Sequence, residues 1–311
     1  MMSTVIEQVC SIALFGLVAL RAPAAWRDPR ARTLWRATVF GAFGLLCRGA
    51  LVPASVLDGL LGGHNWLNLV QNLSAASAFW FGARAVLGLT LDRIPRNHVL
   101  GLLAALILIS VPFILIDKRG TTDGRMFIVD HIDQMPTFIY VVVYTVCVGG
   151  LAGALLAGIR RRRSLFYWPF RVGAIAVIVA AVEEIVYATM AHWSLGSIVV
   201  RGELYHAFTP IFYPGLLLLM VASFLFAAER AGQRRRALRL IAILDPSLAH
   251  HRLAAGAELA QLYEVVVRVR NAQYSSGGPN TAGAEEAEAL LSRYLAEQIP
   301  DFRRPVTYKP Q

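Results

Sequence analysis

Charged side chains are scarce in this chain of 311 residues. Asp, Glu, Lys and Arg together make up 16% of the sequence, whereas a soluble domain holds about 25%. The deficit is concentrated in apolar runs of roughly 20 residues, the length that crosses the hydrocarbon core of a bilayer. This scarcity argues against an ordinary soluble domain and indicates an integral membrane protein.

Cysteine is also rare, and Cys10, Cys47 and Cys147 all fall inside apolar runs. They form no CxxC pair, so we expect no disulfide framework and read them as small core residues. The P-loop, zinc-protease and nucleophile-elbow motifs GxxxxGK[ST], HExxH and GxSxG do not occur in the sequence. These absences favour a non-enzymatic protein with no cofactor and no metal site.

Seven apolar runs predict seven transmembrane helices. They cover residues 4–22, 37–58, 66–90, 98–117, 135–159, 172–192 and 208–228. The predicted fold is therefore all-α: a polytopic membrane bundle in residues 1–229, followed by a small helical tail domain in residues 230–311.

The basic residues give the chain a net charge of +10, but they stand between the apolar runs. We therefore expect no nucleic-acid partner, and the arginines instead predict the topology. The predicted loops one, three and five, together with Arg21 at the end of the first span, carry twelve Lys and Arg residues, and loops two, four and six carry four. Because short cytoplasmic loops collect basic residues, we expect the N-terminus outside the cell and the tail in the cytoplasm.

Two adjacent acids, Glu183 and Glu184, stand near the middle of the sixth predicted span. A charge at the bilayer centre costs at least about 3 kcal/mol, so these side chains should face the bundle or a wet cavity. Residue counting from the cytoplasmic end places Arg48 of the second span at a similar depth. We expect Arg48 to meet one of the two glutamates. Two interpretations stay open: a buried ion pair that fixes helix packing, or a proton, ion or substrate site.

Three amides, Asn68, Gln71 and Asn72, lie in the outer third of the third predicted span. They are candidates for lining an outward-facing pocket. Interhelical hydrogen bonds explain the same side chains equally simply, because polar groups inside a membrane bundle bond across helices.

The tail begins with a basic amphipathic segment, in which Leu238, Ile241 and Leu244 alternate with arginines. The arginines concerned are Arg234, Arg235, Arg236 and Arg239. This pattern is typical of a helix that lies on the cytoplasmic membrane surface and is attracted to anionic lipids. The leucines and isoleucine are then expected to face lipid or the bundle.

Two stretches carry a resemblance to a known family. They read GHNWLNLVQNL at residues 63–73 and LYEVVVRVRNA at residues 262–272. Both are similar to stretches of an uncharacterised actinobacterial family of seven-span integral membrane proteins with a cytoplasmic C-terminal domain of unknown function. Glu264 and Asn271 depart from that family's basic and acidic residues. The resemblance implies a multi-pass protein of the bacterial cell (inner) membrane. The family often carries a transporter label, and its members stand beside helix-turn-helix regulators.

The expected function is therefore a non-enzymatic sensor or regulatory membrane partner that couples its bundle to the cytoplasmic tail. The alternative is a small-solute or proton-coupled transporter that uses Arg48, Glu183 and Glu184. The expected partners are the bilayer with its anionic lipids and a cytoplasmic regulatory protein. The solute, the signal and the oligomeric state are left open by the sequence.

Overall fold

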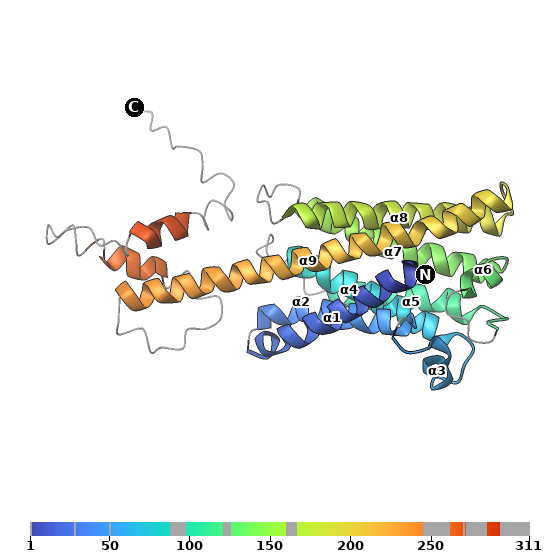
Figure 1. Cartoon of the computed structure of the whole chain (residues 1–311), viewed down its shortest axis with the longest axis horizontal. Helices are drawn as coiled ribbons and strands as arrows, with labels where there is room; N and C mark the ends of the chain where they lie inside the picture. The colour runs from blue at the N-terminus through green and yellow to red at the C-terminus, as the bar shows by residue number, and fades with distance from the viewer. Residues whose placement is uncertain are drawn as a thin grey trace, which may run out of the picture. The chain divides into compact units, whose positions relative to one another are not determined.

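The structure is a computed structural model, and it describes residues 2–27, 29–49, 51–87, 98–120, 126–159, 167–244, 262–269, 271 and 285–292. Within these ranges the regular elements are helices and no strand occurs, which confirms the all-α prediction for this part of the chain (Figure 1). The labelled helices are α1 (Met2–Arg27), α2 (Pro29–Cys47), α3 (Ala54–Gly59), α4 (Trp66–Leu87), α5 (His98–Ile114), α6 (Phe127–His131), α7 (Met135–Ile159), α8 (Trp168–His192) and α9 (Ile198–Leu244).

The chain divides into two compact units, Met1–Ser223 and Phe224–Gln311. The first contains α1 to α8 and the first part of α9. The second contains the rest of α9 and short helices at residues 262–269 and 285–292. From the sequence, we placed the boundary between residues 229 and 230, six residues further along α9.

Four of the described helices are long and apolar enough to cross a membrane. These candidate spans are Glu7–Trp26 in α1, Met135–Ile159 in α7, Trp168–His192 in α8 and Ile198–Leu225 in α9. A shorter apolar stretch, Val99–Ile114, lies in α5. The chain thus has the build of a membrane protein. Helices α2 and α4 occupy the second and third predicted spans, and their crossing of the membrane stays a prediction.

The second predicted span, residues 37–58, is not one helix. Helix α2 starts earlier, at Pro29, and ends at Cys47, and the short α3 follows after Pro53. The backbone N–H groups of Arg48 and Gly49 donate to carbonyls three residues back, at 3.2 and 3.1 Å, and Gly49 has a φ of 85°. Glycine takes this left-handed conformation without strain, so the chain leaves the helix there. Arg48 therefore stands just past the end of its helix and not at its middle.

The seventh predicted span also differs from the structure. We expected this helix to begin at residue 208, but α9 begins at Ile198 and contains Pro210 and Pro214 in its interior. Arg201, Glu203 and His206, which we assigned to the preceding loop, lie in its first turns. Membrane helices tolerate interior proline, because neighbouring groups re-satisfy the freed carbonyls.

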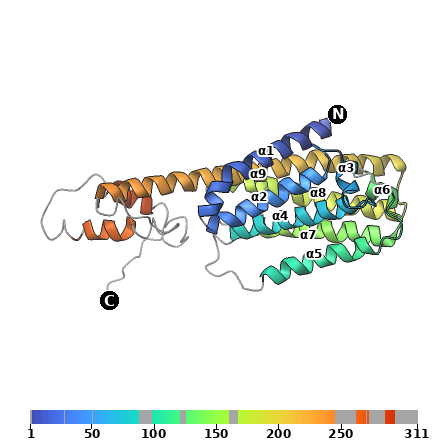
Figure 2. The ribbon, with the colours of Figure 1, turned by 90° about the horizontal axis from the view of Figure 1, so that it is seen from below.

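The helices of the first unit lie side by side (Figures 1 and 2). Small residues set the closest approaches: a Cβ on Gly173 of α8 would lie 2.7 Å from the carbonyl oxygen of Gly215 in α9. A Cβ on Gly149 of α7 would lie 2.9 Å from the Cβ of Ala181 in α8. Such contacts are typical of helix packing in membranes, where small residues allow backbones to approach. They fix α8 between α7 and α9.

The second unit has a small apolar core of its own. Ala237, Leu240 and Ile241 of α9 pack with residues of the two short helices, among them Leu262 and Leu291. We expected Ile241 to face lipid or the bundle, but it is buried in this core instead.

The basic segment of the tail forms part of α9, without a break after the seventh predicted span. The side chains of Arg235, Arg236 and Arg239 are exposed, and that of Arg234 lies outside the described residues. Its attraction to a membrane surface stays a prediction.

Candidate functional site

A cavity of about 430 Å³ lies inside the first unit. Its walls come from α1, α4, α7, α8 and α9, from the residue after α2, and from the segment around α6. Ligand sites in proteins span about 300–1,000 Å³, so this volume suits a small molecule. The polar groups that border it are carboxylates, one guanidinium, amides, hydroxyls and an imidazole.

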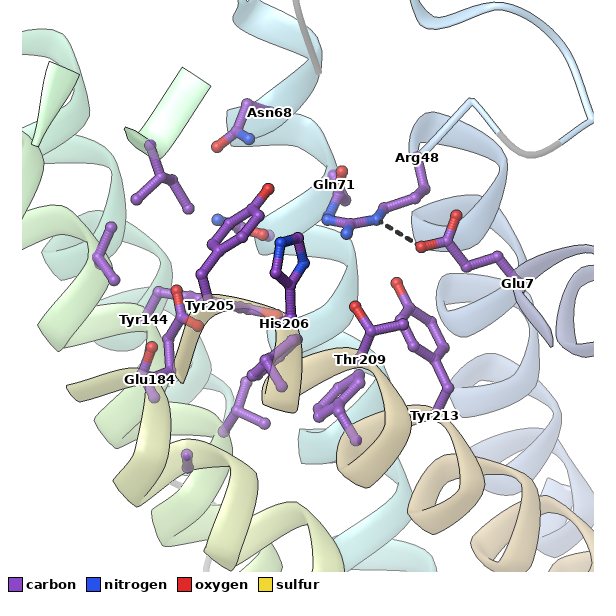
Figure 3. A pocket seen from close by; sticks show the side chains of 18 of the residues that line it. Glu7, Arg48, Asn68, Gln71, Tyr144, Glu184, Tyr205, His206, Thr209 and Tyr213 are labelled. Carbon is purple, nitrogen blue, oxygen red and sulfur yellow. Dashed lines mark hydrogen bonds and ion pairs between the residues drawn. The ribbon is translucent and has the colours of Figure 1, made fainter. Parts of the chain in front are cut away.

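Arg48 and Glu7 form an ion pair at the edge of the cavity (Figure 3). The Arg48 Nε donates to Glu7 Oε1 at 3.4 Å. The Glu7 side chain is 3% exposed and that of Arg48 is 22% exposed. We expected Arg48 to meet Glu183 or Glu184, but its ion-pair partner is Glu7 of α1. Glu7 lies inside the first predicted span, and we did not consider it as a partner.

The helical spacing of residues in the first span indicates that Glu7 faces the inside of the bundle. Cys10, Ser11 and Leu14 follow it at spacings of three, four and seven residues, and all four side chains are buried. These spacings define one helix face. Glu7 therefore belongs to the inward face of α1 and needs a partner inside the bundle.

The two adjacent glutamates of α8 have different surroundings. Glu184 lines the cavity. Glu183 does not, and both of its carboxyl oxygens are buried without a hydrogen-bond partner among the described residues. Neighbouring positions on a helix point about 100° apart, so the two side chains enter different environments. Only Glu184 shares a site with Arg48.

The three amides of α4 border the cavity as well. Asn72 Nδ2 donates to the hydroxyl of Tyr140 at 2.7 Å, and that hydroxyl is 2.8 Å from Asn68 Oδ1 and 3.2 Å from the Asn68 carbonyl oxygen. Asn68 and Asn72 thus tie α4 to α7 and also face the cavity. Gln71 borders the cavity as well, and its side chain makes no hydrogen bond with the described residues.

The start of α4, which positions these amides, is held by a buried acid. Asp58, 0% exposed, accepts hydrogen bonds from the backbone N–H groups of Asn65 at 2.9 Å and Leu67 at 2.6 Å. Carboxylates stabilise helix N-termini by accepting these otherwise unpaired donors. The Asn65 side chain donates in turn to the carbonyl of Arg119, whose guanidinium lies 4.4 Å from the ring centre of Trp66.

Helix α9 contributes most to the cavity, and we missed this contribution. Its lining residues are Tyr205, His206, Phe208, Thr209, Pro210, Phe212 and Tyr213. We had assigned the segment before residue 208 to a loop because polar residues interrupt its apolar run. In a helix that borders a polar cavity, such residues fall on the inner face, which a hydropathy pattern alone does not separate from a loop.

Within the part of the chain that the structure describes, no group of three or more His, Cys, Asp or Glu side chains is placed to hold a metal ion. The cavity instead offers hydrogen-bond donors and acceptors, aromatic rings and a carboxylate. Groups of these kinds can hydrogen-bond a polar solute.

No family model, curated protein or solved structure matches this chain. Membership of the actinobacterial seven-span family therefore stays a prediction from the two stretches at residues 63–73 and 262–272.

Proposed function

We propose that this chain is a membrane sensor that binds a small polar solute in the cavity of its bundle and relays binding to its tail through α9. The bundle has seven spans in the cell membrane, with the N-terminus outside and the tail inside. The protein catalyses no reaction. Its cytoplasmic tail acts on a regulatory partner.

The observation that carries the proposal is that one helix, α9, takes part in both the cavity and the core of the tail. Residues 205–213 of this helix line the cavity, and residues 237–241 of the same helix belong to the core of the second unit. Both segments belong to one element with described helical backbone throughout. A solute that shifts the first segment therefore acts on a helix that also builds the tail. Coupling between two sites requires an element that both sites share, and α9 is that element in this proposal.

The depth of the cavity supports an external solute. Arg48 follows Pro29 by 19 residues, which at 1.5 Å per residue is about 28 Å along the helix. The hydrocarbon core is about 30 Å thick. With the N-terminus outside, the cavity lies in the outer half of the bundle and receives its solute from that side.

Transport is the second candidate, and the polar lining of the cavity favours it. Transporters bind their substrates between helices that are interrupted near the site. Here Pro210 lines the cavity and Pro214 follows one turn later in the same helix. A transporter must also open to the inner side, whereas a sensor needs only to change its tail.

Filling the cavity without a ligand tests the coupling. Thr145 of α7 is 4% exposed and lines the cavity, whereas its neighbour Val146 is 54% exposed and does not. Thr145→Trp, or the smaller Thr145→Phe, should change amide hydrogen exchange in residues 262–269 and 285–292 of the purified full-length protein. Val146→Trp is the matched control and should leave that exchange unchanged. Unaltered tail exchange in both Thr145 variants contradicts the sensor and leaves transport, which is measured as uptake into vesicles.

A further inference from the structure

One carboxylate in the cavity has no direct partner among the described residues. Glu184 lines the cavity and makes no hydrogen bond or ion pair with the described residues. Removing a carboxylate from bulk water is costly unless a cation or hydrogen-bond donors replace the water. A ligand with a positive group would supply this missing interaction.

The formal charges of the residues that line the cavity also favour a cationic ligand. Arg48 and Glu7 neutralise each other as an ion pair. Glu184 is the remaining acid among the lining residues, so the lining has a formal charge of −1 when Glu184 is ionised and His206 is neutral. A monocation brings the filled cavity to neutrality. An anion would add to the negative charge, and Glu7 opposes a carboxylate near Arg48.

The cation suited to this cavity is organic. Tyr144 borders the cavity on the same side as Glu184 in Figure 3, and Tyr205 borders it from α9. The faces of aromatic rings attract ammonium groups, which gives a site for a cation with hydrocarbon substituents. A cavity of about 430 Å³ is also far larger than a bare metal ion needs.

The side of the cavity opposite Glu184 offers hydrogen-bond donors for an uncharged oxygen atom of a ligand. Arg48 uses only its Nε in the bond to Glu7, and its two terminal nitrogens make no hydrogen bond with the described residues. The Gln71 amide lies beside it (Figure 3). In this view Glu184 and Arg48 lie on opposite sides of the space, with His206 between them.

We infer that the ligand is a small organic monocation: an ammonium group binds at Glu184, and a hydroxyl or carbonyl oxygen binds at Arg48 and Gln71. This inference rests on the proposed function, because it assigns a ligand class to the same cavity. It excludes anionic solutes of equal size.

A matched series of four-carbon compounds tests the charge requirement. The probes are 4-aminobutan-1-ol, the neutral butane-1,4-diol, the zwitterion 4-aminobutanoate and the anion 4-hydroxybutanoate. A second set of short alkanolamines, choline and aromatic amines covers other sizes, and sodium chloride covers a bare cation. Each is added at about 10 mM, enough to occupy a site with a millimolar Kd, to the full-length protein in lipid nanodiscs at constant ionic strength. The expected result is a rise in melting temperature with amines and none with the neutral or anionic partners.

The neighbouring glutamates provide the matched variants. Glu184→Gln should weaken amine binding roughly tenfold to hundredfold, the range expected for a lost charged hydrogen bond. Glu183→Gln should keep it, because Glu183 does not line the cavity. Glu184→Asp retains the charge and should bind amines if Glu184→Gln proves too unstable to measure.

Three results overturn the ligand class: stabilisation by no amine in either set, equal stabilisation by the neutral or anionic partners, or stabilisation by sodium alone that depends on Glu184. The tail response to Thr145→Trp is measured without any ligand. A failed amine series with an intact tail response therefore rejects the ligand class and leaves the sensor. Amine binding without a tail response rejects the sensor and leaves the ligand class.

Discussion

The ion pair between Arg48 and Glu7 gives the sharpest test of the packing inside the bundle. At 3.4 Å and an effective dielectric constant of about 20, the Coulomb attraction is about 5 kcal/mol, and desolvation of both groups offsets much of it. The two partners differ in exposure: Glu7 is 3% exposed and Arg48 is 22% exposed. Removing Arg48 therefore strands a more deeply buried charge than removing Glu7 does.

We expect Arg48→Met to lower the free energy of unfolding by about 3 kcal/mol, at the lower end of the range for a broken buried pair. Glu7→Gln should cost about 1.5 kcal/mol, because water in the cavity can solvate the remaining guanidinium. The double variant should cost about 3 kcal/mol, since the glutamine leaves no stranded charge. These values give a coupling energy of about 1.5 kcal/mol, which is measurable in a double-mutant cycle.

Reversible unfolding of the purified protein in mixed micelles with increasing sodium dodecyl sulfate measures these differences. The control cycle pairs Arg48→Met with Glu183→Gln, and it should be additive within about 0.5 kcal/mol because no contact joins those residues. Additivity in the Glu7 cycle as well would refute the reasoning, because the 3.4 Å contact would then carry no net energy.

Three further predictions concern the topology and the packing. A reporter fusion after Gly124 should read external and one after Arg163 should read cytoplasmic, because basic residues favour the cytoplasmic side twelve to four. A cytoplasmic result at Gly124 contradicts the seven-span arrangement. Gly173→Leu should destabilise the bundle by about 1–3 kcal/mol, since even a Cβ would lie 2.7 Å from a carbonyl oxygen of α9. A Cβ on Gly150 would meet nothing within 4 Å, so Gly150→Leu should be nearly neutral in the same unfolding assay. Tyr140→Phe should cost about 1–3 kcal/mol, because it leaves two buried amides without their shared hydroxyl, and unchanged unfolding would show that this network adds no stability.

The sequence predicts best where an apolar run is uninterrupted. Residues 135–159 were predicted as the fifth span, and α7 covers Met135–Ile159. The sixth span was predicted to end at residue 192, where α8 ends. In both cases the hydrocarbon length requirement sets the extent of the helix, and no charge or proline near the C-terminal end disturbs it.

The helix that leads to Arg48 starts earlier than we predicted, which changes the residue count behind its expected depth. We counted Arg48 from residue 37, but α2 begins at Pro29. The eight residues between them amount to about 12 Å, almost half the hydrocarbon core. Arg32 and Arg36 made this stretch look like a loop, although long basic side chains extend to the interface from a membrane helix.

The ion-pair partner of Arg48 could not be predicted from the sequence, for a different reason. Glu7 is 41 residues away in sequence, and no local pattern joins the two. The side chains meet because the end of α2 returns to the beginning of α1 at the same end of the bundle. A pairing between distant segments of this kind depends on the helix arrangement, which spacing along one helix does not determine.

The two glutamates of α8 allow packing and ligand binding to be tested separately in one pair of identical residues. From the sequence, both acids received the same two interpretations, a buried ion pair or a proton, ion or substrate site. In the structure Glu183 is buried without a hydrogen-bond partner among the described residues, whereas Glu184 borders the cavity. If Glu183 serves only packing, Glu183→Gln should maintain or raise stability, because it removes a desolvated carboxylate and retains the shape. If Glu184 serves a ligand, Glu184→Gln should raise the stability of the empty protein and lower its stabilisation by amines. A loss of stability in both glutamine variants would mean that both carboxylates hold the bundle together, and the cavity would then be a packing defect filled by water.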